Sequence, residues 1–145
     1  MPNQTSRRKF FTATAASAST FMILKSGSAR TYAANEKLNI AAIGVGGRGA
    51  SNLRAVESEN LVALCDVDSK RAAGSFKRFP DAKRFKDYRA MLSELESSVD
   101  AVIVATPDHQ HFHASMAAIR LGKHVYCEKP LTHSIWEARQ LTLAA

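Results

Sequence analysis

The sequence is poor in cysteine and in long apolar runs. Its 145 residues include two cysteines, too few for the disulfide framework of a small secreted domain. No apolar run approaches the roughly 18 residues of a membrane-spanning helix. A hydrophobic content of 46% with 23% charged residues excludes a fully disordered chain. The sequence therefore predicts one domain of ordinary size with a real core.

Acidic residues are absent from residues 1–34, which hold five of the 20 basic residues. Residues 35–145 hold the other 15 basic residues and all 13 acidic ones. The net charge of +7 is thus mainly a property of the N-terminal stretch. The remainder is nearly balanced in charge and carries no recognition motif, so a nucleic-acid partner is not expected.

The same N-terminal stretch has the order of a secretory signal: basic, then apolar, then small residues. Arg7 and Arg8 precede two phenylalanines, a pattern that resembles the twin-arginine export signal read by the twin-arginine translocation machinery. Residues 1–34 are therefore interpreted as a signal peptide with cleavage near residues 29–34. The alternative is a basic tail or a short amphipathic helix. A periplasmic or otherwise exported location is expected.

Residues 35–145 alternate between short apolar runs and helix-compatible stretches. Strands are predicted at 38–43, 61–66, 83–85, 101–105 and 124–127, and helices at 50–56, 69–79, 88–95, 111–121 and from 134 onward. The run at 101–105 is continuously apolar, as expected of a parallel strand that is covered on both faces. This alternation predicts an α/β fold with a Rossmann-type doubly wound parallel sheet.

A glycine cluster stands where the first strand should end and the first helix begin. Gly44, Gly46 and Gly49 fit the pattern G-x-G-x-x-G, with Gly47 and Arg48 between them. In this pattern the glycines permit a tight turn, a close approach of backbone to a pyrophosphate, and close packing of the helix on the sheet. Backbone N–H groups at the helix N-terminus favour a phosphate there. The cluster predicts a dinucleotide site, with a purely structural glycine turn as the alternative.

An acidic residue at the end of the second strand supports the dinucleotide prediction. Asp66 follows Gly46 by 20 residues, where a carboxylate can accept hydrogen bonds from the adenosine ribose hydroxyls. A carboxylate at this point repels a 2′-phosphate, so NAD is the predicted cofactor. Lys70 and Arg71 lie close enough in sequence to leave NADP open.

Three later motifs complete a family resemblance. They are Ala105-Thr106-Pro107-Asp108-His109-Gln110-His111, then Gly122-Lys123-His124-Val125, then Cys127-Glu128-Lys129-Pro130-Leu131. Together with the glycine cluster and the acidic residue that follows it, residues 37–145 resemble the nucleotide-binding domain of the Gfo/Idh/MocA family of sugar and cyclitol oxidoreductases. The Glu-Lys-Pro tripeptide is the most specific element.

The resemblance implies roles for six further residues. Lys129 is implied to be catalytic and to lie beside the nicotinamide, where it would hydrogen-bond the substrate and assist its deprotonation. Glu128 and Pro130 are implied to shape the cofactor loop, commonly through a cis peptide bond before the proline. Thr106 and Pro107 are implied to pass beneath the cofactor. The family pattern also places His111 at the start of the adjacent helix, where it is predicted to belong to the cofactor loop, with a capping or packing role as the alternative. Asp108 departs from the pattern, which often has asparagine.

The implied activity is reversible hydride transfer between the nicotinamide and a secondary hydroxyl of a sugar or cyclitol. Two alternatives stay open: NAD-dependent glycoside cleavage by transient oxidation and elimination, and a non-catalytic dinucleotide-binding module. Because family members carry a second domain with the main base, the sequence is interpreted as an N-terminal part without the substrate domain and with an incomplete nucleotide domain. It is expected at most to bind the nucleotide, and the full-length protein to be a homo-oligomer.

Histidine and cysteine spacings suggest no further site. His109, His111 and His113 alternate, but a turn and a helix start do not hold alternate side chains on one face, so no metal is expected. In strand order 3-2-1-4-5, Cys65 and Cys127 are roughly 14 Å apart. A disulfide needs Cα atoms within about 7 Å. Both cysteines are predicted to be buried free thiols.

Overall fold

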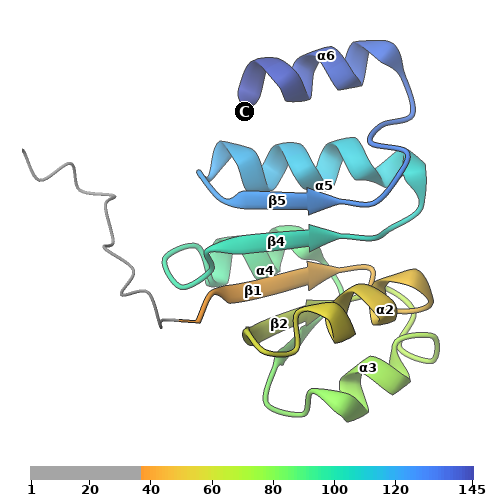
Figure 1. Ribbon diagram of the computed structural model, residues 1–145, viewed down its shortest axis with the longest axis vertical. Coiled ribbons are helices and arrows are strands. Elements are labelled where there is room, and N and C mark those ends of the chain that lie inside the picture. The colour runs from red at the N-terminus through yellow and green to blue at the C-terminus, as the bar shows by residue number, and fades with distance from the viewer. Residues whose placement is uncertain (1–36) are drawn as a thin grey trace, which may run out of the picture. The chain divides into compact units, whose positions relative to one another are not determined.

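The computed structural model describes residues 37–145, so the predicted export signal lies outside the described residues. These residues form a five-stranded parallel sheet in the order β3-β2-β1-β4-β5 (Figure 1). The strands are β1 (Asn39–Ile43), β2 (Asn60–Cys65), β3 (Lys83–Phe85), β4 (Ala101–Val104) and β5 (His124–Cys127). The predicted doubly wound sheet and its strand order are confirmed. The strand order reverses between β1 and β4, which is where open sheets of this type bind their ligands.

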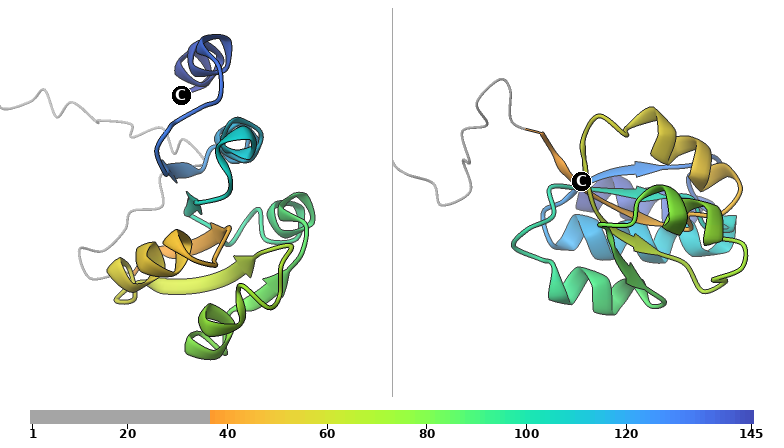
Figure 2. Two further views of the ribbon diagram at one scale, coloured as in Figure 1. Left: turned by 90° about the vertical axis from the view of Figure 1, so that its right-hand side faces the viewer. Right: turned by 90° about the horizontal axis from the view of Figure 1, so that it is seen from below.

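Helices cover both faces of the sheet (Figure 2). On one face lie α2 (Arg48–Ala55) and α3 (Ala73–Arg78), and on the other lie α4 (Tyr88–Glu94) and α5 (Asp108–Arg120). The last helix, α6 (Ile135–Ala144), packs beside α5. Between residues 37 and 145, no helix combines the length and the apolar character that crossing a bilayer requires.

Residues 40–43 of the central strand β1 are apolar because side chains on both of its faces are buried. Ile40 and Ala42 pack against α2 through Leu53. Ala41 and Ile43 belong to the core on the opposite face of the sheet, with α4 and α5. Both sets of side chains are buried because each face of a parallel sheet is covered by helices.

Two predicted helix boundaries are wrong by three or four residues. The helix predicted from residue 111 begins at Asp108, directly after its N-cap Pro107, where an acidic side chain suits the helix dipole. The helix predicted from residue 69 begins at Ala73. Before it, the Asp68 carboxylate accepts hydrogen bonds from the backbone N–H groups of Lys70 and Arg71 and holds that segment as a turn. A side-chain acceptor thus delays the start of α3, whereas an acidic residue after Pro107 favours the earlier start of α5.

The two cysteines are free thiols on strands β2 and β5, with β1 and β4 between them. Cys65 is 2% exposed, and burial raises the pKa of its thiol to about 12. Cys127 is only half-buried, which corrects the prediction that both are buried. The difference follows from position, because β5 lies at the end of the sheet order whereas β2 is flanked by strands on both sides.

Candidate functional site

The glycine turn joins β1 to α2 at a point where no side chain fits. Gly44 adopts a φ of +79°, and a Cβ placed on it would lie 2.7 Å from the backbone of Ala105 and Thr106. A Cβ on Gly49 would lie 1.8 Å from the carbonyl oxygen of Gly44. The first glycine therefore allows the turn to pass the end of β4, and the last allows α2 to lie against the turn. Both roles agree with those predicted from the spacing.

The N-terminus of α2 opens beside this turn without a side-chain cap. Its N-cap residue is Gly47, with a φ of +54°. Helix N-termini present unpaired backbone N–H groups and a partial positive charge. The first turn of α2 contains no acidic residue. This end of the helix is therefore suited to an anionic group of a ligand.

The carboxylate of Asp66 links the end of β2 to the glycine turn. Its Oδ2 accepts hydrogen bonds from the backbone N–H groups of Val45, at 2.9 Å, and Gly46, at 3.1 Å. Its Oδ1 accepts one from the N–H of Asp68 at 2.9 Å. Because a carboxylate oxygen can accept about two hydrogen bonds, Oδ1 keeps capacity for one more donor. Asp66 thus orders the turn and still presents an acceptor beside it.

A cleft of about 830 Å³ runs along the carboxyl ends of the strands. Its wall includes six residues predicted for the cofactor site: Gly44, Gly46, Arg48, Asp66, Thr106 and Pro107. The other predicted residues, Gly47, Gly49, His111, Glu128, Lys129 and Pro130, do not form its wall. The cleft therefore brings together the glycine turn, the Asp66 carboxylate and the strand-end loop, which come from three separate parts of the sequence.

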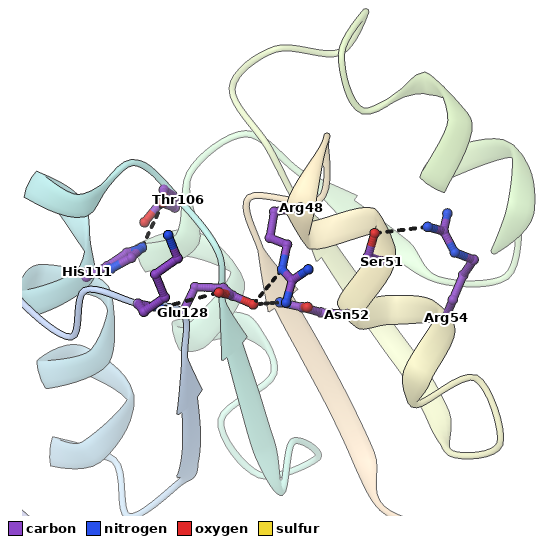
Figure 3. A network of polar contacts seen from close by, with 8 residues as sticks. Arg48, Ser51, Asn52, Arg54, Thr106, His111 and Glu128 are labelled. Carbon is purple, nitrogen blue, oxygen red and sulfur yellow. Dashed lines mark hydrogen bonds and ion pairs between the residues drawn. The ribbon is translucent and has the colours of Figure 1, made fainter.

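A second polar cluster ties the Glu-Lys-Pro loop to α2 (Figure 3). Glu128 is 7% exposed, and its Oε1 accepts hydrogen bonds from Arg48 Nε at 3.1 Å and Asn52 Nδ2 at 3.0 Å. The hydrogen bonds from Asn52 and Arg48 lower the pKa of this carboxyl group. Glu128 is therefore held as a carboxylate that fixes the loop after β5 relative to the glycine helix.

The histidine predicted for the cofactor loop is buried in the first turns of α5. His111 is 2% exposed, and its ring lies between the carbonyl oxygens of Thr106 and Pro130. The peptide bond before Pro130 is cis, as the family resemblance implied. His109 and His113 are exposed, and the described residues contain no group of three or more His, Cys, Asp or Glu side chains that could hold a metal ion.

Lys129 follows Glu128 on the surface of the domain. Its side chain is exposed, and its backbone N–H lies 3.4 Å from Glu128 Oε2. Its position is thus set by the neighbouring residues Glu128 and Pro130, which are anchored to α2 and to His111 respectively.

Sequence reasoning missed Asn52 and part of the cleft wall. Asn52 lies four residues after Arg48 on α2, so both side chains reach the same carboxylate. That spacing was available in the sequence, but the acceptor is 76 residues further along the chain. Several other residues of the cleft wall were not predicted as site residues, among them Lys86, Tyr88 and Arg89. They belong to segments that only the fold brings to this edge.

Replacing Glu128 with glutamine should lower stability at neutral pH and change its pH dependence. The folded state favours the carboxylate, so its contribution is fully present above the ordinary glutamate pKa of about 4.3. That contribution is lost as the pH falls through the lower folded-state value. The difference in denaturation midpoint between wild type and E128Q should therefore shrink in acid. Chemical denaturation at several pH values measures it, with the exposed Glu96→Gln as control. A difference independent of pH would contradict the assignment.

The strand order, the glycine turn and the cleft at the switch point define a dinucleotide-binding domain of the Rossmann type. Residues 38–145 match the oxidoreductase family with an NAD-binding Rossmann fold, Gfo/Idh/MocA, and the chain belongs to that family. The resemblance seen in the motifs is thereby confirmed.

Three relatives illustrate the match. Inositol 2-dehydrogenase 2 of Saccharopolyspora erythraea is 39% identical over 98 residues, 65% of this chain and 28% of that protein. D-xylose 1-dehydrogenase (NADP(+)) of Hypocrea jecorina is 36% identical over 101 residues, 68% of this chain and 25% of that protein. The WlbA dehydrogenase of Thermus thermophilus, solved in complex with NAD and UDP-GlcNAcA, has a TM-score of 0.67 at 28% identity, covering 74% of this chain and 38% of that one. The chain thus spans about a quarter to two fifths of these relatives.

Proposed function

We propose that this chain supplies the nucleotide-binding part of an oxidoreductase that transfers a hydride between a nicotinamide dinucleotide and a secondary hydroxyl of a sugar or cyclitol. The observation that carries the proposal is the cleft at the strand ends, which joins the glycine turn, Asp66 and Thr106 in one wall. Membership of the family supports the reaction class. The names of the relatives, inositol and xylose dehydrogenases, support the substrate class.

The described residues fit a dinucleotide. At Gly44 and Gly49, neighbouring backbone atoms occupy the space that a Cβ atom would fill, so the turn packs closely. The uncapped end of α2 suits the pyrophosphate. In this proposal Gly46, Gly47 and Arg48 bind the phosphates. Thr106 and Pro107 support the nicotinamide half. When bound, the dinucleotide supplies the hydride acceptor, and the chain's own residues orient the reactants around it.

NAD is the proposed cofactor because Asp66 still presents an acceptor for a ribose hydroxyl and would repel a 2′-phosphate. NADP is the alternative, since Arg71, Lys86 and Arg89 line the same cleft. These cations belong to the segments after β2 and β3, near the end of the cleft that holds the carboxylate. The NADP(+) in the name of the xylose dehydrogenase relative is compatible with this alternative.

Replacing Asp66 with asparagine removes the negative charge of the side chain but keeps an oxygen that can order the glycine turn. The asparagine oxygen can still accept from the N–H groups of Val45 and Gly46, whereas the repulsion of a phosphate is removed. NAD binding should weaken about tenfold, a loss of roughly 1.4 kcal/mol, and NADP binding should strengthen relative to it. Isothermal titration calorimetry with both dinucleotides measures the change, and the exposed Asp81→Asn is the control. Unchanged affinity for both would remove Asp66 from the ribose site.

The activity is tested on the intact protein with NAD or NADP and a panel of cyclitols, sugars and glycosides. Formation of reduced nicotinamide with a cyclitol or sugar supports the proposal. Release of an aglycone without net reduction would replace it by the glycosidase alternative. Tight dinucleotide binding without any turnover would replace it by a non-catalytic module. We also propose export through the twin-arginine route, which is supported by Arg7 and Arg8 ahead of the apolar segment.

A further inference from the structure

The buried ring of His111 touches two backbone carbonyl groups, one at each ring nitrogen. Nδ1 lies 2.6 Å from the oxygen of Pro130, and Nε2 lies 2.7 Å from the oxygen of Thr106. Figure 3 shows the ring reaching toward Thr106 from α5. Thr106 follows β4 and Pro130 follows β5, so the ring bridges the loops after two adjacent strands.

A carbonyl oxygen can only accept a hydrogen bond. A neutral imidazole carries one N–H donor and one nitrogen lone pair, so it can satisfy one of the two carbonyl groups and would direct a lone pair at the other. Only the doubly protonated imidazolium donates at both nitrogens. Both distances are as short as those of charge-assisted hydrogen bonds. We propose that His111 is an imidazolium in the folded protein and that its two N–H donors hold the loops after β4 and β5 together.

The surroundings of the ring contain no direct counter-ion. Within the described residues, His111 takes part in no ion pair, so its charge is stabilised by the two carbonyl dipoles. Burial of an ionised ring is tolerated only where its donors are satisfied. Two carboxylates of the segments that the ring joins have other partners: Glu128, two residues before Pro130, binds Arg48, and Asp108, two residues after Thr106, lies beside His109. The ionisable side chains of α5 and of the segments packed around it are Tyr88, Arg89, Glu94, Asp108, His109, His113, Arg120, His124, Tyr126, Cys127, Glu128, Lys129, His133, Glu137 and Arg139.

The bridge makes His111 a positioning residue for Lys129. Thr106 lies in the cleft wall, and Pro130 is bonded directly to Lys129. By fixing the Thr106 and Pro130 carbonyl groups to one rigid ring, His111 sets the spacing between the cofactor cleft and the lysine. This part of the inference rests on the proposed function. The protonation of the ring does not. Loss of either ring proton would release one of the two loops.

The protonation state is tested by NMR on the intact, ¹⁵N-labelled protein without any dinucleotide. Long-range correlations within the histidine rings separate imidazolium nitrogens, which resonate together, from the widely split nitrogens of a neutral ring. We expect both nitrogens of His111 to be protonated at neutral pH, whereas the exposed His113 serves as the internal reference. The variant His111→Gln assigns the signal by removing it. One protonated and one unprotonated nitrogen at His111 would overturn the proposal.

The positioning role is tested with two variants. His111→Phe has no donor, whereas His111→Gln keeps an uncharged amide with two N–H groups. We expect H111F to shift the backbone amide signals of Lys129 and Leu131, and H111Q to restore them in part, with His113→Phe as the control that leaves them in place. Unmoved Lys129 and Leu131 signals in H111F would exclude the role. If H111F fails to fold, comparison of H111Q with wild type decides it, since loss of one bond must still move these signals. Absence of dinucleotide binding by wild type would refute the proposed function and leave the ring assignment intact.

Discussion

Replacing Gly49 with alanine should destabilise the domain by about 3 kcal/mol or more, the upper range for overpacked interiors. The added methyl group would lie 1.8 Å from the carbonyl oxygen of Gly44, far inside van der Waals contact. The turn cannot simply move away. The N–H of Gly44 donates a hydrogen bond of 2.8 Å to the carbonyl oxygen of Cys65. The N–H of Gly49 donates one of 3.1 Å to the carbonyl oxygen of Gly46. Relief therefore requires α2 to shift away from the sheet.

The matched control is Gly74→Ala on α3. A methyl group there meets no atom within 4 Å, and alanine is the better helix former by about 1 kcal/mol. Thermal and urea denaturation should show a large loss for G49A and no loss, or a small gain, for G74A. Dinucleotide binding should disappear in G49A at temperatures where the variant is still folded, because the displaced helix no longer meets the turn. A G49A variant as stable as wild type would show that the close approach of α2 is not required.

The chain-local part of this site could be predicted from the sequence. The G-x-G-x-x-G spacing located Gly44 and Gly49 because the backbone that leaves no room for a Cβ belongs to the turn itself or to the end of β4, the neighbouring strand in the sheet. Asp66 could be placed because a strand that alternates with helices ends at a known edge of the sheet. In each case the residue's neighbours are set by secondary structure alone.

The long-range polar contacts could not be predicted in the same way. The carboxylate of Glu128 accepts a hydrogen bond from Asn52, which lies 76 residues earlier in the chain. The ring of His111 contacts the carbonyl oxygen of Pro130, which lies 19 residues later. These partners depend on side-chain rotamers and on the loop conformation after β5, for which the sequence carries no periodic signal. The start of α3 at Ala73 was missed for a different reason, because the local turn held by the Asp68 carboxylate outweighs helix propensity there.

Replacing Lys129 with methionine should lower the turnover number of the intact enzyme by about a hundredfold to ten-thousandfold, the usual range for a lost acid–base group. Methionine keeps the length and apolar stem of the side chain and removes its ammonium group. Within residues 37–145 that ammonium makes no ion pair, so the stability of the domain should change little. In the proposed reaction, the hydride leaves the substrate carbon, the proton leaves the hydroxyl oxygen, and the side-chain nitrogen of Lys129 helps to hold and release that proton.

The measurement separates this role from simple binding. Steady-state kinetics of K129M should show a fall in kcat, whereas calorimetry should show a dinucleotide Kd close to that of wild type, because the glycine turn and Asp66 are untouched. Lys77→Met on the exposed side of α3 is the control and should leave both quantities unchanged. A retained kcat in K129M would assign the proton transfer to another residue. A large loss of dinucleotide affinity with kcat retained at saturation would make Lys129 part of the cofactor site alone, and His111 would then position a binding residue.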